Sequence, residues 1–449
     1  MPSRVHSAVV RPLRQFKATV LEDACTVAGH YRPLCLTRDS ARRDADGPHQ
    51  FNVSRSVMNR PAALRLALAL CMITTAVNLQ APLYDALAAR DGVGAGATSV
   101  AFACYVLGVF PVLLALNGLA DRVGRKPMII AALCLALMAT LLTMIFPGLI
   151  SLAVARLLMG VGTAMTSAVA PGWMLELFPH QQRRRAANWV TAATSLGFGL
   201  GAAVTGIFVM QTSPLQQTEL VPPSLWLYLG GGSLALILVL GLEDNSSRQR
   251  SASMLRLPVW PPGSLPFGLA IMLAWAMVGL VITLLPTVLA QHGLSGWSGF
   301  AVFGICSCGV LFQPLARQLS PQAATRLGLL ILPPAYALIS WGALEGVLAA
   351  ILIGTVAASS ACYGFIYLGG MSGALEAAGE RASGASAGFF LMAYIGFSLP
   401  VVFTGMLMDR FGHSAALQIF GVVLVLGVML VSVGLMRINQ AEKSRWQAD

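Results

Sequence analysis

The stretch Gly118-Leu119-Ala120-Asp121-Arg122-Val123-Gly124-Arg125-Lys126 lies between two long apolar runs of this chain. Its two glycines, Gly118 and Gly124, permit a tight turn between closely packed helices. Asp121 and Arg125 are spaced to interact across one helical turn or with partners on other helices. An ordinary basic loop does not require an acidic residue among its basic ones. The stretch therefore predicts a specific contact at the ends of two apolar helices.

The composition of the whole chain explains the apolar runs on either side. Of its 449 residues, 56% are hydrophobic and only 10% are Asp, Glu, Lys or Arg, whereas an ordinary soluble domain carries about 25% charged residues. The mean hydropathy is +0.73, so the chain has too little polar surface to cover a water-soluble globule. This excludes a cytosolic enzyme, a disordered chain and a disulfide-stapled secreted module.

Apolar runs follow one another at regular intervals after Pro61, separated by loops rich in glycine and proline. At roughly 20 residues per membrane-spanning helix, about twelve spans fill the length. We predict an all-α polytopic membrane protein whose twelve transmembrane helices form two pseudo-symmetric six-helix bundles. The predicted spans are residues 62–84, 97–118, 127–146, 149–173, 187–210, 224–242, 264–288, 298–316, 326–344, 347–369, 386–408 and 414–436.

A polar stretch divides the chain into two halves that look like degenerate copies. Leu119-Ala120 is matched by Leu315-Ala316, and Arg185-Ala186 by Arg381-Ala382, at one shared offset of 196 residues. The predicted domains are a disordered cytoplasmic N-terminal extension at 1–57, a first bundle at 58–242, a cytoplasmic linker at 243–262, a second bundle at 263–437 and a cytoplasmic tail at 438–449.

The distribution of Lys and Arg sets the predicted orientation. With the first helix entering from the cytoplasm, fifteen of these residues gather on one side of the membrane and only Arg90 and Arg410 on the other. We therefore predict an integral protein of the plasma (inner) membrane with both termini cytoplasmic. The net charge of +11 is broken into small clusters between apolar runs, so membrane topology explains it better than nucleic-acid binding does.

The stretch from Gly118 to Lys126 resembles motif A of the major facilitator superfamily in its bacterial form. The matching residues are Gly118, Asp121, Arg122, Gly124, Arg125 and Lys126. The resemblance implies a gate in which Asp121 faces the start of span eleven and Arg125 pairs with Glu176 at the end of span four. The second copy, Leu315-Ala316-Arg317-Gln318-Leu319-Ser320, has lost the acid. Only the first copy is expected to act as a full latch.

Span four carries Arg156-Leu157-Leu158-Met159-Gly160-Val161-Gly162, which resembles motif B of the same family. An arginine about two turns inside a span is energetically costly and usually faces a cavity or a partner. The alternative is an arginine that snorkels to the interface. Asn78 and Gln80 on span one lie at a similar depth, in a stretch resembling motif D, and predict a polar cluster with Arg156.

Two features bear on ion coupling and direction. Ile73 stands where multidrug exporters of the family often have an aspartate, which leaves Asp85 and Glu176 as the candidates for proton coupling. Residues 197–206 of span five partly resemble motif C, which is associated with drug/proton antiport. The alternative for this stretch is a glycine-lined packing face.

Trp275, Tyr363 and Tyr394 are the aromatic candidates for a substrate pocket, with packing between helices as the alternative. No hydrolase, ATPase or dinucleotide motif is present, and no cysteine pair has zinc-site spacing, so we predict no enzymatic activity, cofactor or metal. We predict a monomeric transporter that moves a small-molecule substrate across the lipid bilayer by alternating access, with a proton as the candidate coupling ion. Export of drug-like or metabolite compounds is favoured. The alternatives are an importer or facilitator of a small metabolite and a non-transporting membrane receptor.

Overall fold

The computed structural model describes residues 59–115, 123–179, 182–211, 220–243 and 258–446. These residues form helices and contain no strand. Within the described ranges, twelve helices or runs of successive helical segments are long and apolar enough to cross a membrane, in agreement with the predicted spans. The N-terminal extension at 1–57, residues 244–257 of the predicted linker, and Gly118, Asp121 and Arg122 lie outside the described residues.

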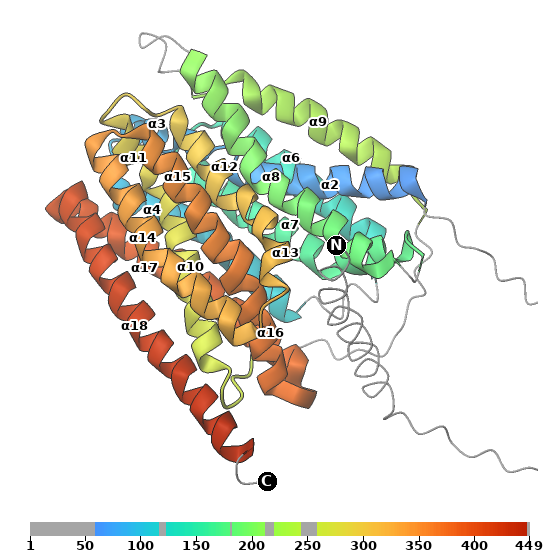
Figure 1. Ribbon diagram of the computed structural model, residues 1–449. Coiled ribbons are helices and arrows are strands. Elements are labelled where there is room, and N and C mark those ends of the chain that lie inside the picture. The colour runs from blue at the N-terminus through green and yellow to red at the C-terminus, as the bar shows by residue number, and fades with distance from the viewer. Residues whose placement is uncertain (1–58, 116–122, 180–181, 212–219, 244–257, 447–449) are drawn as a thin grey trace, which may run out of the picture. The chain divides into compact units, whose positions relative to one another are not determined.

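The first six spans come from eight helical segments, whose α-helices are labelled in Figure 1. They are α2 (Arg60–Asn78), η2 (Ala81–Leu83) and α3 (Tyr84–Asp91), which together make span one, then α4 (Ala95–Ala115), α6 (Arg125–Ile145), α7 (Leu149–Glu176), α8 (Arg183–Gln211) and α9 (Pro223–Leu240).

The second six spans contain more interruptions. They are α10 (Leu265–Thr283) with α11 (Leu285–Ala290), α12 (Trp297–Ser307) with η5 (Cys308–Phe312) and α13 (Gln313–Ala316), α14 (Pro321–Glu345), α15 (Leu348–Ser359) with η6 (Ser360–Ile366) and α16 (Tyr367–Ala378), η7 (Gly379–Arg381) leading into α17 (Ala382–Phe411), and α18 (His413–Trp446).

Local sequence explains where these helices begin and end. Asn59 caps α2 by accepting the Ala62 N–H at 3.3 Å, and Pro61 occupies the first turn, where no N–H is needed. Gly92 ends α3 in the left-handed conformation, with φ of 66°. Pro82 lies in the η2 turn that separates α2 from α3, because proline cannot continue the hydrogen-bond ladder of a helix.

Glycine contacts hold neighbouring helices together. A Cβ on Gly108 of α4 would come closer than 3.0 Å to the Leu157 carbonyl oxygen of α7, and a Cβ on Gly160 of α7 would do the same to the Tyr105 carbonyl oxygen of α4. The backbones of α4 and α7 therefore touch where only glycine fits, as in other small-residue contacts between membrane helices.

The glycines of the motif C-like stretch are packing positions. A Cβ on Gly197 or Gly201 would come closer than 3.0 Å to carbonyl oxygens of α2, and one on Gly206 closer than 3.0 Å to the Gly296 carbonyl oxygen beside α12. Close helix packing therefore accounts for these glycines.

The most extensive contacts between the halves of the chain are made by α4 with α17 and by α8 with α12. We call the end of the spans where α4 begins and α17 terminates the Asp409 end, and the end where α6 begins and α7 terminates the Arg125 end. By contrast, α9 and α18 lie along the margins of the bundle in Figure 1, and they carry exposed apolar residues such as Trp226 and Leu430. These two helices present their apolar faces to lipid.

Candidate functional site

Arg156 is completely buried in α7. Its Nη1 donates a hydrogen bond to the Val77 carbonyl oxygen of α2, at 2.5 Å. The guanidinium lies 4.3 Å from the ring centroid of Phe102 and 5.3 Å from that of Tyr105, both on α4. A cation over aromatic faces is stabilised more strongly when water is excluded. The arginine thus points into the bundle and does not snorkel to the interface.

The Arg156 side chain keeps unused hydrogen-bonding capacity. Its Nε and Nη2 atoms have no hydrogen-bond partner, and neither does the hydroxyl of Tyr84, whose ring centroid lies 6.0 Å from the guanidinium. A buried donor without a partner lowers stability, by about 1–3 kcal/mol for a neutral group and by more for a charged one. Such groups are therefore rare unless a ligand or a bound water completes them.

An aromatic wall continues from Arg156 across to the second half of the chain. Phe102 lies 4.7 Å from Phe397 of α17, measured between ring centroids, and Phe397 lies 5.7 Å from Trp275 of α10. Trp275 in turn lies 5.2 Å from Tyr394 and 6.3 Å from Tyr363. The three aromatic residues singled out in the sequence therefore form one cluster, which Phe397 connects to the rings under Arg156.

Two details mark this cluster as more than packing. The Trp275 indole Nε1 is buried without a hydrogen-bond partner. Tyr363 lies in η6, a π-helical segment in the middle of span ten, and π segments within α-helices occur frequently at functional sites. Arg156 and Trp275 together thus offer unpaired donors from both halves of the chain.

The expected polar cluster of Asn78, Gln80 and Arg156 is not formed as one group. The Asn78 amide donates to the Phe198 carbonyl oxygen of α8 at 2.8 Å, and the Gln80 amide donates to Thr143 Oγ1 of α6 at 2.8 Å. The two side chains leave span one on different faces because they are two residues apart on a helical turn. Asp85 directly follows Tyr84 in α3, and its side chain is partly buried.

At the Arg125 end, Arg125 Nη1 and Glu176 Oε1 form an ion pair of 2.5 Å, the pair that the family resemblance implied. The Arg125 side chain lies over Gly172 of α7. Arg125 stands at the positive end of the α6 dipole and Glu176 at the negative end of α7, so each charge is unfavourably placed for its own helix. The pair therefore stabilises the contact between the two helices and does not stabilise either helix on its own.

Two other described residues of the stretch from Gly118 to Lys126 make structural contributions. Gly124 has φ of 98°, a conformation that favours glycine, and directly precedes α6. Lys126 Nζ donates to the carbonyl oxygens of Leu240 and Leu242, at 2.8 and 2.7 Å. It thus caps the end of α9, where carbonyl groups lack helical partners. In the second copy, Arg317 Nη1 donates to Asn188 Oδ1 of α8 at 3.1 Å, so this copy also ties helices together at the Arg125 end.

At the Asp409 end, one carboxylate joins the two halves. Asp409 of α17 accepts the backbone N–H groups of Ala95 and Gly96, at 2.8 and 2.9 Å, at the start of α4. A helix N-terminus favours an anion, and a Cβ on Gly94 or Gly96 would come closer than 3.0 Å to this carboxylate. The Arg125–Glu176 pair and the Asp409 contact are present together in this structure.

The sequence did not single out Phe102, Tyr105, Phe397 or Asp409. A usable signal existed for Phe102, because α4 and α7 both begin at the Asp409 end. Phe102 and Arg156 are each seven residues beyond the first residue of their helix (102 − 95 and 156 − 149), and therefore lie at equal depth. Phe397 and Asp409 offered no such signal, since their partners come from a distant span.

Twelve span-length helices, with a buried arginine and an aromatic wall contributed by both halves of the chain, have the architecture of a secondary transporter. The family model of the Major Facilitator Superfamily matches residues 66–400, well over half of the chain. The chain belongs to this family of transporters.

Solved structures of transporters show the same fold. A POT family transporter in complex with 5-aminolevulinic acid superposes with a TM-score of 0.65 at 12% identity, over 84% of this chain and 96% of that one. A D-xylose-proton symporter superposes with a TM-score of 0.61 at 15% identity, over 84% of this chain and 97% of that one. Identities this low establish the fold alone.

A sequence relative covers a shorter segment. A Salmonella paratyphi B (strain ATCC BAA-1250 / SPB7) protein whose name assigns it to multidrug resistance, MdtD, is 34% identical over 109 residues. The matched segment spans 24% of this chain and 23% of that protein. It therefore supports common ancestry over part of the chain and leaves the substrate open.

Proposed function

We propose that this protein exports a small solute by alternating access, and that the solute binds between Arg156 and the Trp275 cluster. The observation that carries the proposal is the unpartnered pair of Arg156 donors, buried beside aromatic rings from both halves of the chain. A site contributed by both halves is what a rocking motion of the halves requires. Export is supported by the multidrug-resistance name of the partial relative MdtD.

The site favours a solute with two parts. Arg156 presents donors in a planar fork suited to a carboxylate or phosphate. Trp275, Tyr363 and Tyr394 present flat apolar faces with few polar atoms. We therefore propose an aromatic or apolar compound that carries an acidic or other hydrogen-bond-accepting group, a class that includes drug-like molecules and metabolites.

Orientation and coupling belong to the same proposal. The Arg125 end is cytoplasmic, both termini are cytoplasmic, and the monomer works in the plasma (inner) membrane. A proton is the candidate coupling ion. Asp85 and Glu176 are its candidate carriers, because both carboxylates lie toward the ends of their spans.

A thermal-shift screen followed by flux measurements tests this function. Purified protein is screened against aromatic acids, aromatic amines and neutral aromatics, because a ligand stabilises the state that it binds. We expect the aromatic acids to stabilise the protein, and to move across proteoliposomes with and without an imposed pH gradient. Trp275→Ala is expected to abolish the shift. Trp341→Ala, which alters an exposed tryptophan on α14, is the matched control and should retain it. Bound solute without flux in either direction would favour a receptor.

The Arg125–Glu176 pair yields a prediction about gating. Arg125→Glu and Glu176→Arg are each expected to reduce flux several-fold, while the double swap recovers most of it. The pair is partly exposed, at 27% and 46% of the side chains, so its contribution to stability is only about 0–1 kcal/mol. The swap also places each charge at the favourable end of its helix dipole.

Flux and unfolding temperature of the four proteins, normalised to membrane abundance, check this prediction. The three variants should unfold within a few degrees of wild type. Additive losses in the double-mutant cycle would mean that the two charges do not act as a pair.

A further inference from the structure

A cleft lies at the Arg125 end, between the starts of α2 and α8 and the chain that follows α7. Its volume is about 840 Å³, far more than a phosphate ion needs, since a liquid water occupies only about 30 Å³. None of its residues belongs to the Arg156 site. The lining residues are Arg60, Pro61, Leu64, Phe178, Arg185, Asn188 and Trp189.

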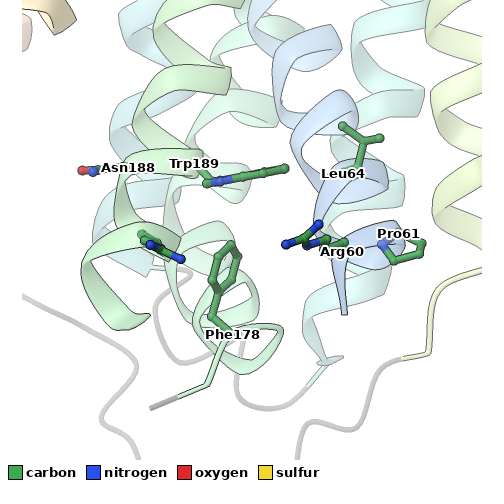
Figure 2. Close-up of a pocket in the computed structure, with 7 residues that line it drawn as sticks. Arg60, Pro61, Leu64, Phe178, Asn188 and Trp189 are labelled. Carbon is green, nitrogen blue, oxygen red and sulfur yellow. The ribbon is translucent and has the colours of Figure 1, made fainter. Parts of the chain in front are cut away.

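The two helices that line the cleft contribute the same pair of side chains, a charged one and an apolar one. Arg60 and Leu64 are one helical turn apart on α2, and Arg185 and Trp189 are one turn apart on α8. In Figure 2, Leu64 and Trp189 lie further along the helices than Arg60 and Phe178, away from the helix ends. Two helices therefore present the same order, arginine at the end and an apolar side chain one turn inside.

The charge in the cleft is unbalanced. Its lining contains two guanidinium groups and no carboxylate. The ion pair that the described part of the chain shows is Arg125–Glu176, so within it neither Arg60 nor Arg185 has an acidic partner. Arg185 makes one long contact of 3.4 Å to the amide oxygen of Gln182.

The position of the cleft matches a membrane boundary. The span-length segments Arg60–Asp91 and Arg183–Gln211 both begin here. Spans that begin here would place the arginines at headgroup depth, and Leu64, with 62% of its surface exposed, one turn further toward the hydrocarbon region. Trp189 packs edge-on against Phe178 with ring centroids 6.0 Å apart, and tryptophan is enriched at such interfaces.

We propose that this cleft binds one anionic phospholipid, with its phosphate between Arg60 and Arg185 and the first part of an acyl chain against Leu64 and Trp189. Guanidinium groups bind phosphate oxygens through charge-assisted, often bidentate, hydrogen bonds. Basic pockets between membrane helices are suited to acidic headgroups. The proposal does not depend on which solute the protein transports.

The experiment measures lipid binding by the purified full-length protein in a neutral detergent. Native mass spectrometry counts bound lipid during titration with dioleoyl phosphatidylglycerol, dioleoyl phosphatidylcholine or inorganic phosphate. We expect saturable binding of one phosphatidylglycerol and much weaker binding of the other two. Arg60→Gln/Arg185→Gln should weaken phosphatidylglycerol binding roughly thirtyfold. Each basic side chain contributes about 1 kcal/mol to binding, and about 1.4 kcal/mol corresponds to a tenfold change in affinity.

The matched control is Arg410→Gln/Arg437→Gln, which removes two exposed arginines outside the cleft and should bind as wild type does. Equal phosphatidylglycerol binding by the two double variants would overturn the proposal. Competition by inorganic phosphate at equal concentration would also overturn it, in favour of a site for a free anion.

A second measurement uses the wild-type protein and does not depend on the folding of any variant. Phosphatidylglycerol with a photoreactive group on its acyl chain should label the peptides that contain Leu64 and Trp189. Labelling confined to other spans would overturn the proposal.

Discussion

Gly160→Ala is expected to prevent most of the protein from folding. A methyl group at this position would come closer than 3.0 Å to the Tyr105 carbonyl oxygen, which belongs to the backbone of α4 and cannot rotate away. Overpacking of an interior usually reduces stability by about 1–3 kcal/mol, and here two helices must separate. The reciprocal contact of Gly108 with Leu157 would be lost with it.

Size-exclusion chromatography of detergent-solubilised membranes checks this expectation. We expect the amount of monodisperse Gly160→Ala protein to be at least about tenfold lower than that of wild type. Gly230→Ala is the matched control. It introduces the same methyl group into α9, where a Cβ meets nothing within 4 Å, and should retain the wild-type yield. A normal yield of Gly160→Ala would show that α4 and α7 are further apart than in this structure.

The fold was largely predictable because the bilayer imposes a simple rule on sequence. A run of about 20 apolar residues must form a helix, since every backbone group has to be satisfied within it. Helix starts such as Arg125 and Leu149 were predicted to within about two residues. The contact of Arg125 with Glu176 was implied by the resemblance of a short motif to a known family, and the structure shows it between the ends of adjacent spans.

The site was less predictable, since periodicity does not say which faces of distant helices meet. Arg156 was identified through the energetic cost of burying its charge, which is visible in one sequence. Phe397 has no such mark, yet it connects Phe102 to Trp275. Asn78 and Gln80 were placed at the right depth but assigned to the wrong partners, because depth along a helix does not fix direction around it.

Arg156→Ala is expected to reduce transport by at least about a hundredfold. The substitution removes two donors, Nε and Nη2, that no protein group satisfies, and a hydrogen bond to a charged group contributes about 1.5–3 kcal/mol. Arg156→Lys keeps the positive charge but loses the planar fork, so we expect it to bind solute weakly and to retain only a few per cent of the flux.

The unfolding temperature separates a site residue from a structural one. In the empty protein the unpartnered donors of Arg156 are unfavourable, and they offset the contacts with Val77 and Phe102. We therefore expect Arg156→Ala to unfold close to the wild-type temperature and to lose stabilisation by solute. Arg326→Ala, which removes another arginine that donates to a backbone carbonyl (Leu435 O, 2.9 Å), is the control and should keep that stabilisation. A lower unfolding temperature with unchanged flux per folded molecule would mean that Arg156 only holds α7 against α2.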